Sequence, residues 1–457
     1  MQAQAGRNLS MTGSLAGMNV TLGSGQSMTL HDVQSSGALQ ANAQSGTLTV
    51  DGTVTSLSTA QLQAGSDTTV TGALQSAGRL DLTSGGNLGI GGTVSALSDA
   101  AVTSSGAATV NGLLQSAGPL TLTSGANTSI GGTVLSTGDV TLKNAAGSLT
   151  STGTIQAGRD LLIDAAHAVD LGTLQTTAQR DITVLAGGDL IANGTVIGQR
   201  NGVLNAGGAI GGAAAIAFGQ AATLQSGGDT RLTGSLRGDT VQMQAGGSAS
   251  LHDVTAAATM SLSAAQDLAT TGTVVAGSTA TLQAGGNLGV DGVMQAVGDI
   301  ALTATNGSIS TSGPIAGNGA IGMQAGTDIL LNGAVGAARG MSLNAARDVS
   351  ATQALNVLAN DLRITAGNNI GVADVQAGGA LSVTARNGDA AFNGTAAALG
   401  ETTVNAGRDV VVRGTLAGGG DGTSATHAPT SVQAGRDVQV TGMLGAARRS
   451  ASTLRAT

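Results

Sequence analysis

A glycine flanked by short alternating apolar residues recurs about every twenty residues along this chain. Typical copies are Val70-Thr71-Gly72, Ile90-Gly91-Gly92 and Val110-Asn111-Gly112. The same glycine returns at Gly13, Gly52, Gly132, Gly153, Gly172, Gly194, Gly212, Gly234, Gly272, Gly292, Gly313, Gly333, Gly394, Gly414 and Gly442, with Asp32, Asp253, Gln353 and Asp374 in its place where it lapses. A fixed period of this size is typical of a solenoid, in which each repeat buries its apolar face by stacking on its neighbours. The sequence therefore predicts a long surface made by repetition rather than one pocket.

Within each repeat the apolar residues alternate with polar or small ones. Around Gly292 they are Leu288, Val290, Met294 and Ile300. Alternation at period two indicates β-strands, and the runs are too short for helices. Glycine suits the bends because it adopts positive φ at little cost. We therefore expect an all-β, right-handed parallel β-helix with three short strands in each coil of about 20 residues, the hand following the crossover rule for parallel strands.

The unbroken period also decides the expected domain organisation. Length alone would suggest about three domains of ~150 residues each. Because repeat arrays grow by adding coils, we expect residues 1–457 to form one continuous β-helix segment. One repeat is lengthened by a glycine-rich insertion at 418–429, which is more typical of a tolerated loop than of a binding loop.

Composition excludes several classes of protein. Hydrophobic residues make up 41% of the chain and charged residues 10%, the reverse of a disordered chain. The net charge is −8 and no basic stripe is present, which argues against nucleic-acid binding. No run approaches the ~20 apolar residues of a membrane span. With no cysteine and only Phe218 and Phe392 as aromatic residues, aliphatic side chains must fill the interior.

An Asp or Asn recurs one or two residues after a glycine, just before an apolar pair. Its members include Asn87, Asp189, Asp229, Asn287, Asp409 and Asp437. Stacked Asp and Asn side chains can bond turn backbone and form a ladder, whereas aligned carboxylates can bind Ca²⁺ in glycine-rich repeats. Here the position also accepts Ser, and Arg often stands beside it, as in Arg408-Asp409. This pattern favours the structural ladder, so we expect no metal and no cofactor.

Several phrases resemble the haemagglutinin repeat of the filamentous haemagglutinin family, the exoproteins of bacterial two-partner secretion. They are Gln156-Ala157-Gly158-Arg159-Asp160-Leu161, Asn405-Ala406-Gly407-Arg408-Asp409-Val410 and Gln433-Ala434-Gly435-Arg436-Asp437-Val438. The resemblance implies a right-handed β-helix that is secreted or held at the outer cell surface. It also implies a host-cell receptor or a neighbouring cell as partner.

The resemblance further implies export through an outer-membrane transporter that recognises an N-terminal secretion domain. That domain has no counterpart in this chain, and no C-terminal toxin module is evident. We therefore expect a fragment of a longer exoprotein.

Arg237-Gly238-Asp239 is the one short motif with a known class of partner, the host integrins. An exposed Arg-Gly-Asp presents a cation and a metal-bridging carboxylate. The motif follows Gly234 in a segment where neighbouring coils are expected to turn, so we expect it to be accessible. In a chain this rich in glycine, an ordinary polar turn is the alternative.

Three functions remain open. The resemblance favours the shaft of a surface adhesin, which attaches through an extended repetitive surface. The stalk of a contact-dependent growth inhibition toxin is the first alternative. A polysaccharide-acting enzyme on the same fold is disfavoured, because the chain has no Trp or Tyr and few charges to cluster. His31 and His252 share the phrase Leu-His-Asp-Val at equivalent positions, which indicates repeat duplication rather than catalysis.

Overall fold

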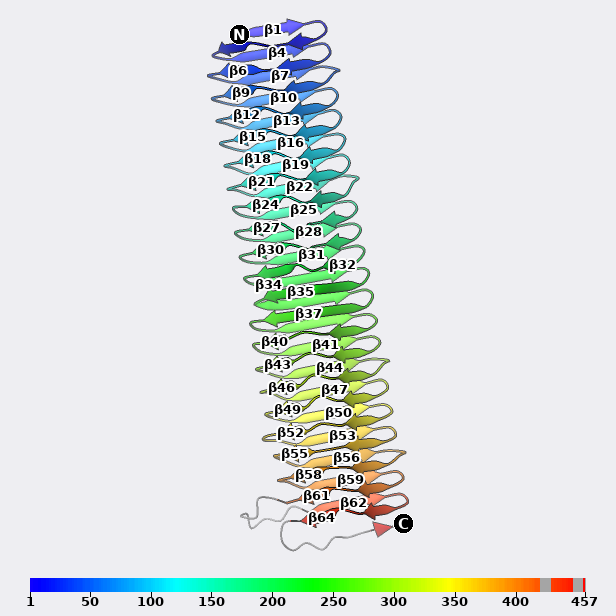
Figure 1. Cartoon of the computed structure of the whole chain (residues 1–457). Coiled ribbons are helices and arrows are strands. Elements are labelled where there is room, and N and C mark those ends of the chain that lie inside the picture. The colour runs from blue at the N-terminus through cyan, green and yellow to red at the C-terminus, as the bar shows by residue number, and fades with distance from the viewer. Residues whose placement is uncertain (420–428, 447–454, 457) are drawn as a thin grey trace. The chain divides into compact units, whose positions relative to one another are not determined.

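The structure is a computed structural model, and it describes residues 1–419, 429–446 and 455–456. These residues contain strands and no helix (Figure 1). The chain divides into unit 1, Met1–Ser235, and unit 2, Leu236–Thr457, which are described separately below.

Each coil begins with a strand that is usually five residues long, here called the first strand. In unit 1 the first strands are β1 (Gln2–Ala5), β4 (Val20–Ser24), β7 (Leu39–Ala43), β10 (Ala60–Ala64), β13 (Leu80–Ser84), β16 (Ala100–Ser104), β19 (Leu120–Ser124), β22 (Val140–Asn144), β25 (Leu161–Ala165), β28 (Ile182–Ala186), β31 (Gly202–Ala206) and β34 (Ala221–Ser226). In unit 2 they are β36 (Thr240–Ala245), β38 (Met260–Ala264), β41 (Ala280–Ala284), β44 (Ile300–Ala304), β47 (Ile321–Ala325), β50 (Met341–Ala345), β53 (Leu362–Ala366), β56 (Leu381–Ala385), β59 (Thr402–Ala406), β62 (Thr430–Ala434) and β65 (Arg455–Ala456).

Two shorter strands complete the coil. After β13 the second strand is β14 (Leu88–Ile90) and the third is β15 (Thr93–Ala96), and in unit 2 β42 (Leu288–Val290) and β43 (Met294–Ala296) follow β41 in the same way. The first corner joins the first and second strands, the second corner joins the second and third, and the third corner leads to the next coil.

Within each unit, strands pair in parallel with their equivalents one coil on, as where Leu82 of β13 lies opposite Val102 of β16. Such stacking satisfies the backbone groups along the coil axis at a spacing of ~4.8 Å. The predicted parallel β-solenoid is confirmed, with about 21 turns among the described residues. Its right hand and its continuity over 1–457 stay predictions.

The core is formed by the inward-facing residues of all three strands. In the coil of β13, Leu82 of the first strand, Leu88 of the second and Val94 of the third are buried, whereas Thr83 on the first strand is exposed. One ring enters the core of unit 1, that of Phe218. It fits because Gly202 lies beside it, where an added Cβ would come within 2.0 Å of the ring.

The repeat glycine is required for a reason that differs from the expected one. Among the described glycines, positive φ occurs only at Gly172, Gly212 and Gly419. Most repeat glycines instead meet the backbone of the preceding coil. A Cβ on Gly112 would lie 1.9 Å from the carbonyl oxygen of Gly92. Close stacking of the second corners, rather than left-handed backbone, therefore excludes side chains there.

Two strands run straight through the second corner. They are β35 (Thr230–Gly238), which contains the boundary between the two units, and β37 (Ala249–Ala256). Asp253 stands in the middle of β37 at the position of the repeat glycine. Its Oδ1 accepts a hydrogen bond from the Thr273 N–H at 2.8 Å. In β37 an Asp side chain therefore occupies the glycine position and bonds the next coil, whereas β35 keeps Gly234 there.

Candidate binding surface

The first corner carries a ladder of side-chain acceptors. In unit 1, Asn87 Oδ1 accepts the Ala107 N–H at 2.9 Å, and Asp189 Oδ1 accepts the Ala209 N–H at 2.8 Å. Asp229 stands at the equivalent corner position and is also engaged. Each rung joins one coil to the next, as expected for side chains that satisfy turn backbone.

The ladder is longest in unit 2. Asn287 donates its N–H to Asp267 Oδ1 at 2.7 Å, and its own Oδ1 accepts the Ser308 N–H at 3.0 Å. The series then continues coil by coil through Asp328, Asp348, Asn369, Asp389 and Asp409 to the N–H of Asp437. Corner carboxylates of this ladder are thus engaged with the neighbouring coil.

Arginines clamp several of these carboxylates from the next coil. Arg347 Nε donates to Asp328 Oδ1 at 2.7 Å, and Arg408 pairs with Asp389 at 2.8 Å. Arg436 pairs with Asp409 in the same way. The hydrogen bond from Arg347 lowers the pKa of the Asp328 carboxyl, and that from Arg436 lowers the pKa of Asp409. Among the described residues, no group of three or more His, Asp or Glu could hold a metal ion.

A second ladder lies at the third corner of unit 1, and it was not predicted. Asp160 and Asp181 donate their N–H groups to Asp139 Oδ1 and Asp160 Oδ1, each at 3.1 Å. Arg159 and Arg180 approach these carboxylates within 3.5 Å. The signal was present in the sequence as Gly-Arg-Asp at Gly158, but the phrase was assigned to the family resemblance rather than to a second corner.

The two histidines of the repeated Leu-His-Asp-Val phrase lie at exposed corners. His31 Nδ1 is 3.0 Å from Asp51 Oδ1, and this hydrogen bond raises the pKa of His31. His252 Nδ1 is 3.1 Å from Thr271 Oγ1. These contacts join equivalent corners of adjacent coils, as the ladders do.

The Arg-Gly-Asp motif lies at the end of a strand rather than wholly in a turn. Arg237 and Gly238 are the last two residues of β35, and only Asp239 occupies the bend. The side chains of Arg237 and Asp239 are exposed, whereas Gly238 is buried. Neither charged side chain has an ion pair or side-chain hydrogen bond with the described residues. The motif is accessible, but its backbone is held in a ladder through Gly238 O, which accepts the Ala257 N–H at 3.0 Å.

A polar column runs along the outward face of the first strands of unit 2. Its members are in register from coil to coil and are all uncharged: Gln244, Ser263, Gln283, Thr303, Gln324, Asn344, Thr365, Thr384, Asn405 and Gln433. This column was not predicted, because outward residues of successive coils can be aligned only when the register between their strands is known. It presents one amide or hydroxyl group per coil.

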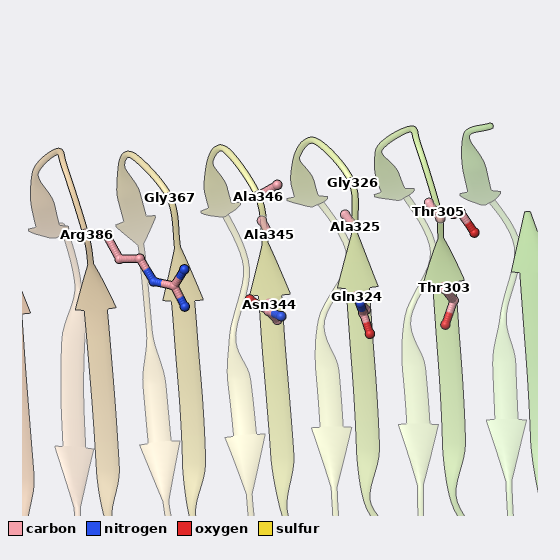
Figure 2. A pocket seen from close by; sticks show the side chains of 11 residues that line it. Thr303, Thr305, Gln324, Ala325, Gly326, Asn344, Ala345, Ala346, Gly367 and Arg386 are labelled. Atoms are coloured by element: carbon pink, nitrogen blue, oxygen red, sulfur yellow. The ribbon is translucent and has the colours of Figure 1, made fainter. Parts of the chain in front are cut away.

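A groove of about 460 Å³ lies beside part of this column (Figure 2). Thr303, Gln324 and Asn344 line one side, and small corner residues such as Gly326 line the other. Arg386 follows β56, and its guanidinium extends beside Gly367 (Figure 2). The groove therefore combines hydrogen-bonding groups from consecutive coils with one cation.

The insertion predicted at 418–429 lies almost entirely outside the described residues, since residues 420–428 are not described. The strands on either side are β61 (Thr415–Gly418) and β62. Its role stays a prediction.

Comparison with known protein families identifies the family to which this chain is related. A profile described as a haemagglutinin repeat matches residues 249–313 and 376–456, and another, described as a hemagglutinin repeat, matches residues 2–95. No curated protein and no solved structure matches the chain. The chain belongs to the filamentous haemagglutinin family.

The filamentous haemagglutinin match includes much of the first-corner ladder. Asn87, Asn287, Asp409 and Asp437 lie within the matched ranges, whereas Arg237-Gly238-Asp239 lies outside them. The haemagglutinin repeat of the sequence thus corresponds to the coil of the solenoid. None of the described segments forms a helix of the length and apolarity that a membrane crossing requires.

Proposed function

We propose that this chain is part of the surface-exposed shaft of a filamentous-haemagglutinin-like exoprotein and attaches through its extended repetitive surface. The polar column carries the proposal. It offers one uncharged hydrogen-bonding side chain per coil over ten coils of unit 2, at a spacing of ~4.8 Å. Weak contacts repeated at fixed spacing add to a strong attachment without any single deep site.

The partner in this proposal is a host cell surface or a neighbouring cell. Export through an outer-membrane transporter, by way of a secretion domain outside this chain, accords with the family, as does a secreted or cell-surface location. We infer no catalytic role. The corner carboxylates that could act as acids or bases are engaged in bonds between coils, as Asp328 is with Arg347.

A binding assay on cells tests the proposal. The full chain carries a fluorescent label, and its binding is compared with that of the double variant Gln324→Ala/Asn344→Ala. The matched control, Gln295→Ala/Asn356→Ala, removes outward polar side chains from the third strands β43 and β52 (Leu355–Val357). Weaker binding by the column variant alone supports the proposal. Equal binding by all three proteins contradicts a role for the column.

Arg237-Gly238-Asp239 is a second candidate attachment site, because both charged side chains are exposed and neither has an ion pair within the described part of the chain. Asp239→Glu keeps the charge but moves the carboxylate by one methylene. Asp99→Glu is the control, since the next coil places Pro119 at the equivalent corner, where no N–H can bond the carboxylate. Loss of binding to integrin-bearing cells in Asp239→Glu alone would assign attachment to this motif.

The stalk of a contact-dependent toxin uses the same repeats and remains the alternative. Such a stalk differs from an adhesin shaft because it carries a toxin to a neighbouring cell. Growth inhibition of neighbouring cells by the parent exoprotein, with no attachment by this chain, would favour the stalk.

A further inference from the structure

Large apolar side chains are exposed at one corner of the coil. In unit 2, Leu358 and Leu399 are 76% and 57% exposed, and both stand directly after a third strand. The strands that precede them are β52 and β58 (Thr395–Ala398), with β55 (Val375–Ala377) between. Gly378 follows β55. Leu358, Gly378 and Leu399 therefore occupy the same corner position in three consecutive coils.

The two leucines enclose a notch of about 340 Å³. Ala377, Ala398 and Gly378 contribute to its walls, and no charged residue lines it. Position 378 requires glycine, because a Cβ there would lie 2.0 Å from the carbonyl oxygen of Leu358, so no side chain fills the notch from this position. Backbone bonds fix both sides of it: Gly378 N–H donates to Val357 O at 2.8 Å, and Leu399 N–H donates to Ala377 O at 2.9 Å. The notch is therefore built into the coil.

The same alternation occurs independently in unit 1. Leu57 and Leu97 are each 69% exposed at the third corner, and Ala77 lies between them. The strands that precede these residues are in register, with Ser76 paired to both Ser56 and Ala96. A large apolar residue, a small residue and another large apolar residue thus follow one another at the coil spacing in each unit.

We propose that the Leu358–Gly378–Leu399 edge is a self-association surface whose occupant is a second copy of this chain. The alternation has a period of two coils, ~9.6 Å. A partner that fills such an edge must carry leucines at the same period, and this chain does. When two copies meet antiparallel with a shift of one coil, Leu399 of each enters the Gly378 notch of the other, which is an isologous two-fold contact.

Other occupants fit the edge less well. A membrane surface would favour a contiguous apolar face with a basic rim, whereas this edge alternates and the chain is acidic, with a net charge of −8. The absence of charge in the notch also removes repulsion between identical copies. The contact is small compared with a standard interface, so the dimer is expected to be weak and concentration-dependent.

Sedimentation measurements on the full chain test the proposal. We expect a reversible monomer–dimer equilibrium that Leu399→Ser weakens by about tenfold or more. The matched control is Leu330→Ser, which removes an outward leucine, 39% exposed, from β48 (Ile329–Leu331). A dimer unaffected by Leu399→Ser, or a wild-type chain that stays monomeric up to hundreds of micromolar, would overturn the proposal.

Disulfide trapping gives a second readout that does not depend on affinity. The chain has no cysteine, so Leu399→Cys introduces a single thiol. In the proposed dimer the two residues 399 lie on adjacent coils, close enough to join. Mild oxidation should give a covalent dimer with Leu399→Cys and little with Leu330→Cys. Equal trapping of both variants would mean that contact is random.

Discussion

At the residue scale, the second corner shows how a repeat selects glycine without left-handed backbone. Gly92 and Gly112 stack so closely that the carbonyl oxygen of one occupies the place of a Cβ on the other. Gly89, on an outward position of strand β14, has no such constraint, because an added Cβ there would have no atom within 4 Å. The two kinds of glycine look alike in the sequence, but replacing them with alanine has different effects on the stability of the fold.

This difference predicts opposite outcomes for one substitution. Gly112→Ala should destabilise the protein by about 2–4 kcal/mol, because the added methyl group meets backbone that cannot move alone. Gly89→Ala should be neutral or stabilising by up to ~1 kcal/mol, since it lowers the entropy of the unfolded chain. Denaturant unfolding of both variants measures the difference, and equal stabilities would refute the stacking argument.

The arginine clamps predict a pH dependence. Because the pKa values of Asp328 and Asp409 are lowered in the folded protein, the clamps stabilise it above the unfolded pKa of ~3.9. That stability is lost as the pH falls below this value toward the folded pKa. Melting temperatures between pH 6 and pH 2.5 should therefore fall less steeply in Arg347→Gln than in wild type.

The control for this prediction is Arg386→Gln, which removes an exposed arginine that has no carboxylate partner among the described residues. Its melting temperature should follow the wild-type profile. If Arg386→Gln flattened the profile as much as Arg347→Gln, net charge rather than the clamp would explain the effect.

At the element scale, the coil is held by its corners as well as by its strands. The sequence predicted the three-strand coil and the first-corner ladder position, because both depend on local periodicity and on the preference of Asp and Asn for turns. It did not predict the third-corner ladder of Asp139, Asp160 and Asp181. Nor did it predict that Arg237 and Gly238 lie at the end of β35 rather than in a turn, because the residue at which a strand ends depends on pairing between coils, which the local pattern does not encode.

The ladder predicts one loss and one gain. Asn287→Leu removes the acceptor for the Ser308 N–H and should cost about 1 kcal/mol. Ala107 interrupts the ladder between Asn87 and Asn127, so Ala107→Asn should add a rung and stabilise by about 0.5–1 kcal/mol. Thermal unfolding of the two variants measures both effects. Changes of the same sign would show that these corners do not work as rungs.

At the scale of the whole molecule, repetition distributes the proposed attachment over many coils. In both units most aliphatic residues are buried in the core, and many corner Asp and Asn side chains bond the next coil. The outward face of the first strands of unit 2 carries a column of amides and hydroxyls, in which neighbouring coils present similar groups. Fold and family could be predicted from the sequence because nearly every repeat contains the same pattern of glycine and alternating apolar residues. The outward column could not, because it has meaning only once the register between coils is known.

The central claim is that attachment is shared among coils. Its most direct test is equilibrium binding of the full chain to cells as Gln283, Gln324, Asn344 and Asn405 are replaced by alanine one after another. The account predicts a graded loss, with each replacement weakening binding by a similar small factor. Complete loss at one replacement, or full binding after all four, would contradict it.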